Sequence, residues 1–262
     1  MIAETLSPSR RLGKIYALEA WYELLKLLRM PGYLVPMFAF PLGFYLLFGV
    51  AMAGRMSRGF DMSRYLLATY GSFGVMGVAL FGFGVGVAIE RGQGWMLFKR
   101  ATPMPPLAYF FAKLAVCLLF SVILTTLLFT LGATAGGVRQ PLTTWLSLGG
   151  VVVAGSIPLG AFGLALGYWA GPNSAPATVN LIYLPAALAS GMWFPMEMLP
   201  TFLQRLAPWL PSYHYAQLAL GRIGFGRGEP VGRSVAVLVV FAVVSLALAW
   251  WGYRRDEGKT YG

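Results

Sequence analysis

Residues 114–138 read LAVCLLFSVILTTLLFTLGATAGGV, a stretch without a charged side chain. A helix needs about 20 apolar residues to cross the hydrocarbon core of a bilayer. Because lipid offers the backbone no hydrogen-bond partners, a segment inside it must satisfy its own N–H and C=O groups, and an α-helix does so. This stretch therefore predicts a transmembrane helix and, with it, an all-α membrane protein.

Comparable uncharged runs recur along the chain, which is 58% hydrophobic and only 11% charged. Soluble proteins carry about 25% charged residues, so a large soluble protein is excluded. One uncharged run, from Gln140 to Met196, is too long for one span, and the helix-breaking cluster Gly171–Pro176 divides it. The sequence then predicts a single transmembrane domain over 1–262, with six spans at about 33–53, 65–89, 114–136, 144–169, 177–194 and 234–253.

The distribution of Lys and Arg predicts the orientation. If both termini are cytoplasmic, the inner segments carry more basic residues than the outer ones, as the positive-inside rule requires. We therefore expect a multi-pass protein of the inner (plasma) membrane with both termini in the cytoplasm. The net charge of +11 comes from basic residues that flank apolar spans. Anionic membrane lipid, and not nucleic acid, is the partner that this arrangement favours.

Residues 15–30 have the pattern of a helix that lies on the membrane, an elbow before the first span. One face is apolar: Leu18, Trp21, Tyr22, Leu25 and Leu28. The opposite face carries Glu19, Glu23 and Lys26. Trp and Tyr suit the headgroup level of a bilayer. We take Trp21, Tyr22, Glu23 and Lys26 as the site residues of this elbow, and an ordinary solvated helix is the alternative.

Residues 195–222 are too short and too interrupted by proline to cross the bilayer, and they predict one or two re-entrant or interfacial helices on the outer side. An apolar face is expected from Leu199, Phe202, Leu203, Leu206, Trp209 and Leu210. The other candidate residues of this segment are Phe194, Pro195, Glu197, Pro200, Arg205 and Pro211. Glu197 and Arg205 are candidates for an ion pair, and His214, the one histidine, is expected to be structural.

Glycine pairs four residues apart predict close helix packing. They are Gly82 and Gly86, Gly132 and Gly136, and Gly163 and Gly167. Packing within one bundle and a seam between two copies are both open.

The sequence offers no catalytic residue and no metal site. It lacks a Gly-x-x-x-x-Gly-Lys-Ser/Thr phosphate loop, so it does not bind ATP in that way, and no cofactor of its own is expected. A single histidine argues against a histidine-based triad or metal centre. The expected spans carry no mid-membrane charge, which argues against an ion-driven carrier.

The connection 90–106 between the second and third spans is unusual. Its first part, residues 90–103, reads ERGQGWMLFKRATP. Met96, Leu97 and Phe98 are too apolar for a freely solvated loop, so we expect lipid, the chain itself or a partner protein to cover them. An interfacial loop with snorkelling Lys and Arg is the alternative. The transmembrane domain has no energy source of its own, and this connection is where another chain could apply force to it.

These features together resemble the membrane subunits (permeases) of type-2 ATP-binding-cassette exporters. The resemblance rests on Glu90-Arg91, Gly94, Arg100–Pro103 and Lys113, and on Ser190–Pro195, Leu199-Pro200 and Leu210-Pro211. It implies an N-terminal elbow helix, an external re-entrant hairpin between spans five and six, and a coupling helix in 90–106. The residues that would contact the ATPase are Glu90, Arg91, Gly94, Trp95, Met96, Leu97, Lys99, Arg100, Thr102 and Pro103. Trp95 and Leu97 depart from the residues common at their positions.

The resemblance also implies a function. Two permease chains, identical or different, would sit on two ABC ATPase (nucleotide-binding) chains that bind ATP and Mg, and this chain itself would be non-catalytic. The cargo would be a drug, an antibiotic or a lipid-like amphiphile. A permease for polysaccharide, haem or sodium is one alternative. A membrane scaffold or assembly factor that transports nothing is another, and copurification of an ATPase distinguishes it.

Overall fold

The computed structural model describes residues 8–51, 61–96 and 104–257, and every regular element within them is a helix. The predicted all-α class is therefore confirmed. The elements are α1 (Pro8–Leu28), α2 (Pro31–Phe44), η1 (Tyr45–Ala51), α4 (Met62–Ala79), η2 (Leu80–Val85), α5 (Gly86–Gly92), α7 (Pro106–Thr134), α8 (Leu142–Ala154), α9 (Ser156–Trp169), α10 (Ala175–Ala189), η3 (Met196–Met198), α11 (Thr201–Leu206), η4 (Ala207–Trp209), α12 (Pro211–Arg222) and α13 (Val231–Glu257).

Five helical segments of the described chain are long and apolar enough to cross a membrane. They are Pro31–Ala51, Met62–Gly92, Leu107–Thr134, Leu142–Trp169 and Val231–Arg255. Each corresponds to one of the six predicted spans. The remaining one, predicted at 177–194, contains only the 15-residue helix α10. At about 1.5 Å per residue, α10 alone is shorter than the hydrocarbon core.

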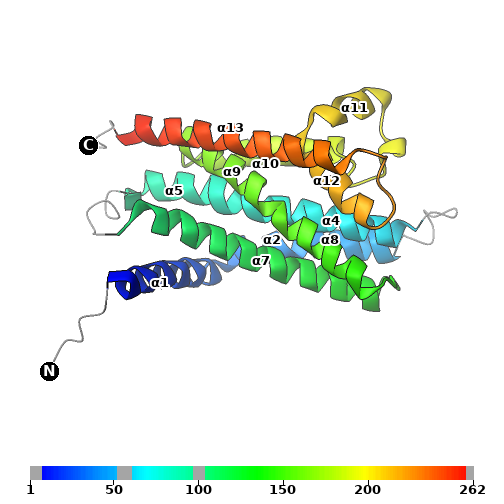
Figure 1. The fold of residues 1–262 in the computed structure, drawn as a ribbon, viewed down its shortest axis with the longest axis horizontal. Coiled ribbons are helices and arrows are strands. Elements are labelled where there is room, and N and C mark those ends of the chain that lie inside the picture. Colours follow the sequence, from blue (N-terminus) through cyan, green and yellow to red (C-terminus); the bar gives the residue numbers. More distant parts are fainter. Residues whose placement is uncertain (1–7, 52–60, 97–103, 258–262) are drawn as a thin grey trace.

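The long helices run side by side along one axis of the molecule, and α13 lies along α9 (Figure 1). The continuous segment α4–η2–α5 is central, because nearly all residues of α4 are buried. The first and last long segments are peripheral and expose large apolar side chains such as Phe40 and Val239. The start of α1, the end of α5 and the end of α13 lie at one end of the bundle, and α11 lies at the other (Figure 1).

The fourth span bends between α8 and α9. Pro158 has no N–H and cannot donate to the carbonyl group of Ala154, so the helix is interrupted there. At the bend, the ring of Tyr215 lies so close to Gly155 that a β-carbon at position 155 would have no room. The Tyr215 hydroxyl donates a hydrogen bond of 2.6 Å to the carbonyl oxygen of Val152. The bend therefore seats α12 in the bundle.

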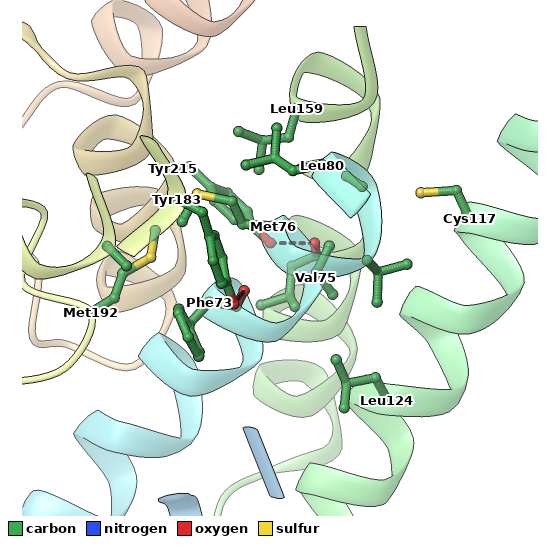
Figure 2. Close-up of a cluster of buried hydrophobic side chains, with 14 of the residues drawn as sticks. Phe73, Val75, Met76, Leu80, Cys117, Leu124, Leu159, Tyr183, Met192 and Tyr215 are labelled. Carbon is green, nitrogen blue, oxygen red and sulfur yellow. Dashed lines mark hydrogen bonds between the residues drawn. The ribbon is translucent and has the colours of Figure 1, made fainter. Parts of the chain in front are cut away.

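An aromatic pair fixes α10 against α4 (Figure 2). The rings of Phe73 and Tyr183 stack with their centroids 4.7 Å apart. The Tyr183 hydroxyl donates to the carbonyl oxygen of Phe73 at 3.0 Å. Gly77, one turn further along α4, leaves room for that hydroxyl, because a β-carbon there would lie 2.9 Å from it.

Glycine lets α9 and η2 approach each other backbone to backbone. A β-carbon at Gly163 would lie 2.9 Å from the carbonyl oxygen of Ala79. One at Gly167 would lie 2.8 Å from the carbonyl oxygen of Phe83. This pair therefore serves packing within one chain, which is one of the two alternatives that the sequence left open.

The segment after α10 turns back into the bundle. Gly191 adopts a φ of 73°, which ends α10, and α12 then packs inward with most of its side chains buried. His214 is fully buried. Its Nε2 lies 3.0 Å from the carbonyl oxygen of Pro208, which can only accept, so Nε2 donates there, and its Nδ1 lies 3.1 Å from the Ser234 hydroxyl. The expected structural role of this histidine agrees with these contacts.

The expected ion pair of Glu197 and Arg205 is wrong. Glu197 pairs with Arg227 at 2.8 Å instead, because the chain after α12 returns to the same end of the molecule. The expected single apolar face is also split. Leu199 is buried, whereas Phe202 and Trp209 are exposed, because the packing against α10 and α12 covers one side of α11 and η4 only.

Candidate functional site

Five side chains from three helices form a buried polar group at the end of the bundle that carries the start of the 90–106 connection. We call it the charge cluster, and it consists of Glu23 and Lys26 of α1, Glu90 of α5, and Tyr109 and Lys113 of α7. Glu23, Glu90 and Lys113 are 7%, 8% and 4% exposed. Charged side chains are almost never so deeply buried unless they are paired.

Lys113 is the centre of the charge cluster. Its ammonium group donates to Glu23 at 2.9 Å and to Glu90 at 3.0 Å. Lys26 donates to Glu23 at 2.6 Å and also contacts Glu90. The Tyr109 hydroxyl donates to the second carboxylate oxygen of Glu90 at 2.6 Å. Two carboxylates and two ammonium groups therefore balance one another, and the fifth member supplies a further hydrogen bond.

The electrostatics of Glu23 follow from this arrangement. Burial alone would raise the pKa of its carboxyl group, but the ammonium groups of Lys113 and Lys26 outweigh burial and hold the pKa below its ordinary value. Glu23 therefore stays ionised at neutral pH. A carboxylate with a lowered pKa stabilises the folded state above its unfolded pKa, and that contribution is lost as the pH falls through the folded value.

Arg91, the neighbour of Glu90, points to a different helix. Its guanidinium group donates to the carbonyl oxygen of Gly167 at 2.6 Å and lies 5.4 Å from the centre of the Tyr168 ring. The last carbonyl groups of α9 have no partner within the helix, so a cation is favourable there. Glu90 and Arg91 together tie the end of α5 to α1, α7 and α9.

The chain turns away from α5 at Gly94. After α5 ends at Gly92, Gly94 adopts a φ of 75°, a conformation that glycine takes at helix ends without strain. Trp95 follows and is 55% exposed, whereas Met96 is partly buried against the hydrophobic core. Leu97, Lys99, Arg100, Thr102 and Pro103, also predicted for coupling, lie outside the described residues.

The elbow residues separate into two groups. Trp21 and Tyr22 are exposed at 54% and 63%. Glu23 and Lys26 face the bundle as part of the charge cluster, because α1 packs along the start of α7 (Figure 1). Sequence reasoning placed both on the polar face of α1 but missed that this face meets Lys113. It missed Tyr109 altogether. One signal for the pairing was available in the sequence: an acid, Glu90, ends the second span, and a base, Lys113, precedes the third.

The predicted residues of the outer segment, 194–211, belong to the opposite end of the molecule and are not brought to the charge cluster (Figure 1). Pro195 and Leu199 are buried there, whereas Trp209 is 83% exposed. Over residues 8–51, 61–96 and 104–257, no group of three His, Cys, Asp or Glu side chains is placed to hold a metal ion.

Removing the Tyr109 hydroxyl should weaken the charge cluster without creating a new charge. We expect Tyr109→Phe to lower the free energy of unfolding by roughly 1.5–3 kcal/mol, the range for a hydrogen bond to a charged group. Unfolding by SDS in mixed micelles measures it. Tyr22→Phe is the control because Tyr22 is exposed, and equal stabilities of the two variants would contradict the prediction.

Comparison with known proteins adds to this geometry. The model of the family described as "ABC-2 family transporter protein" matches residues 57–251, which include α4, α5, α7 and α13 up to its last residues. The chain is also similar to a putative transport permease, YvfS, of Bacillus subtilis (strain 168). The two are 26% identical over 235 residues, which cover 90% of this chain and 95% of that protein. The family match spans most of the chain, so the resemblance seen in the sequence is confirmed, and the chain belongs to the ABC-2 family of transporter proteins.

Proposed function

We propose that this chain is the membrane-spanning subunit of an ATP-driven exporter whose ATPase is a separate chain. The charge cluster is the observation that carries the proposal. It joins α1, α5 and α7 on either side of the 90–106 connection, where a partner can apply force. Paired buried charges are costly to separate, so these helices move together when the connection moves.

The mechanism is a shift between two conformations of the bundle. ATP and Mg bind to the partner ATPase, and this chain supplies no catalytic residue. Closure of the ATPase pushes the connection, and Glu90 and Arg91 pass that displacement to α1, α7 and α9. The ligand on the partner thereby favours one of two states of the spans. The cargo is a drug, an antibiotic or a lipid-like amphiphile, which suits walls rich in apolar and aromatic side chains.

The proposed arrangement in the membrane has six spans, with α10 and the residues after it forming the fifth. Both termini lie in the cytoplasm, α1 is the elbow at the inner surface of the plasma membrane, and 195–222 is the outer re-entrant segment. A second permease chain packs against the peripheral apolar helices, where Phe40 and Val239 are exposed. Two such chains sit on two ATPase chains.

Trp95 allows a direct test, because it is half exposed at the start of the connection and its removal should leave the bundle intact. A central aromatic anchor contributes about 2 kcal/mol or more to an interface, which is roughly thirtyfold in affinity. We therefore expect Trp95→Ala to lower recovery of the ATPase chain with the tagged permease from its own host. Light-scattering and immunoblot ratios of the purified complex measure the loss.

Trp209→Ala is the matched control, since Trp209 is exposed at the opposite end of the molecule. Its recovery of ATPase should equal that of the unmodified chain. The proposal fails if the unmodified chain recovers no nucleotide-binding chain and its membrane vesicles show no ATP-dependent transport. Equal losses in the two variants would remove Trp95 from the docking surface.

A further inference from the structure

A cavity of about 790 Å³ lies between α1, the start of α2, and η2 with α5. Its volume falls in the range of about 300–1,000 Å³ that is typical of small-molecule sites. Most of its wall is apolar, made by Leu25, Leu27, Met30, Val85 and Ile89. Three members of the charge cluster, Glu23, Lys26 and Glu90, also line the cavity, but its apolar wall takes no part in the ion pairs. This wall has the chemistry to hold a hydrocarbon chain.

Tyr33 is a polar residue in the wall of this cavity. Its hydroxyl oxygen is buried and has no hydrogen-bond partner among the described residues. Leaving such a group unsatisfied costs roughly 1–3 kcal/mol. Gly82 lines the cavity beside Tyr33, and a β-carbon there would have the Tyr33 hydroxyl as its nearest neighbour, 3.9 Å away. Position 82 is therefore uncrowded on this side.

The rim of the cavity carries a basic side chain. Arg29 is exposed at the end of α1, four residues before Tyr33, and it makes no ion pair with any residue in the described part of the chain. The other charged groups of the lining are Glu19, Glu23, Lys26 and Glu90. Glu23 and Glu90 are neutralised by Lys26 and Lys113, and Glu19 is itself engaged.

Two aromatic side chains complete the rim. Tyr22 and Trp95 line the cavity and are both more than half exposed. Rings of this kind, apolar with one polar atom, favour the level of the lipid headgroups. The cavity thus combines an apolar wall, an aromatic rim and one exposed guanidinium group without an ion pair in the described part of the chain, and these features suit a lipid with an anionic headgroup at a membrane surface.

We propose that this cavity binds one anionic glycerophospholipid. The phosphate group sits at Arg29, and an acyl chain lies along the apolar wall. Arg29 lies in the turn between α1 and α2, where the apolar wall of the cavity meets its rim. The site does not depend on ATP-driven transport. A bound lipid would stabilise the junction of α1, α2 and α5.

The test titrates the purified full chain in dodecylmaltoside micelles with dioleoylphosphatidylglycerol. The midpoint of thermal unfolding is followed by intrinsic fluorescence, since a ligand that binds only the folded state raises it. We expect the anionic lipid to reach half of its effect at a lower mole fraction than dioleoylphosphatidylcholine. Inorganic phosphate should have no effect, because it cannot use the apolar wall.

Arg29→Gln should raise the half-saturating fraction of phosphatidylglycerol about fivefold, the size expected for one basic side chain at an anionic lipid surface. Lys14→Gln is the matched control, because Lys14 is an exposed base of the same helix that does not line the cavity. Equal responses to the two lipids, or an unchanged response in Arg29→Gln, would overturn the proposal.

Gly82→Leu distinguishes the cavity from the open surface. Gly82 lines the cavity, so the new side chain should take up part of its volume and abolish the preference for the anionic lipid. Gly150→Leu is its control, because a β-carbon at Gly150 meets nothing within 4 Å. A preference that persists in a folded Gly82→Leu protein would place the lipid on the outer surface and sink the cavity assignment. Arg29→Gln remains decisive if Gly82→Leu does not fold.

Discussion

Lys113→Met should lower the free energy of unfolding by about 3–5 kcal/mol, the cost of breaking a buried ion pair by removing one partner. Lys113 is 4% exposed and contacts both Glu23 and Glu90, so its loss leaves two buried carboxylates that share the more exposed Lys26. Methionine keeps the length of the side chain and introduces no cavity of comparable size. Unfolding by SDS in mixed micelles measures the change.

The matched control is Lys14→Met on the exposed part of α1, which we expect to alter stability by no more than about 0.5 kcal/mol. Adding Glu90→Gln to Lys113→Met should restore part of the loss, because it removes one of the unpaired charges while keeping the Tyr109 contact. A double variant whose losses simply add would show that the charge cluster is not a unit.

Gly167→Leu should be the most disruptive of the glycine substitutions. A β-carbon there would lie 2.8 Å from the carbonyl oxygen of Phe83 and 3.0 Å from that of Gly84, and backbone atoms cannot move aside cheaply. Overpacking typically costs roughly 1–3 kcal/mol, and a branched side chain at a backbone contact belongs at the upper end of that range or above it. The same SDS titration measures the loss.

Gly150→Leu is the control, because it is the same substitution in the same span at a position where a β-carbon meets nothing within 4 Å. Glycine is a poor helix former, so this substitution should be neutral or slightly stabilising. If Gly167→Leu were as stable as Gly150→Leu, the close approach of α9 to η2 would be wrong.

Much of the fold follows from uncharged runs, because a bilayer penalises every unpaired polar group. Five such runs correspond to long apolar helices. The third helix begins near Leu107 and not at 114, since Lys113 is paired inside the bundle and so does not mark a helix end. The run 177–194 is uncharged throughout, yet its helix stops at Ala189, because Gly191 turns the chain. Hydropathy alone does not register that turn.

The site was harder to predict than the spans. The sequence singled out Glu90, Arg91, Glu23 and Lys26 separately, and it marked Lys113 only as the start of a span. Their pairing joins residues as far apart as Glu23 and Lys113, and it depends on how α1 lies against α7. No local periodicity encodes that approach. Tyr109 gave no sequence signal at all, because a tyrosine at the start of an apolar helix is common.

The balance of charges in the cluster bears on the membrane potential. Moving one elementary charge through the whole field is worth about 2.3 kcal/mol per 100 mV. The cluster combines two carboxylates with two ammonium groups, so a displacement of the whole group transfers no net charge. In the proposed mechanism, the charge cluster itself therefore adds no voltage dependence to a movement of α1, α5 and α7.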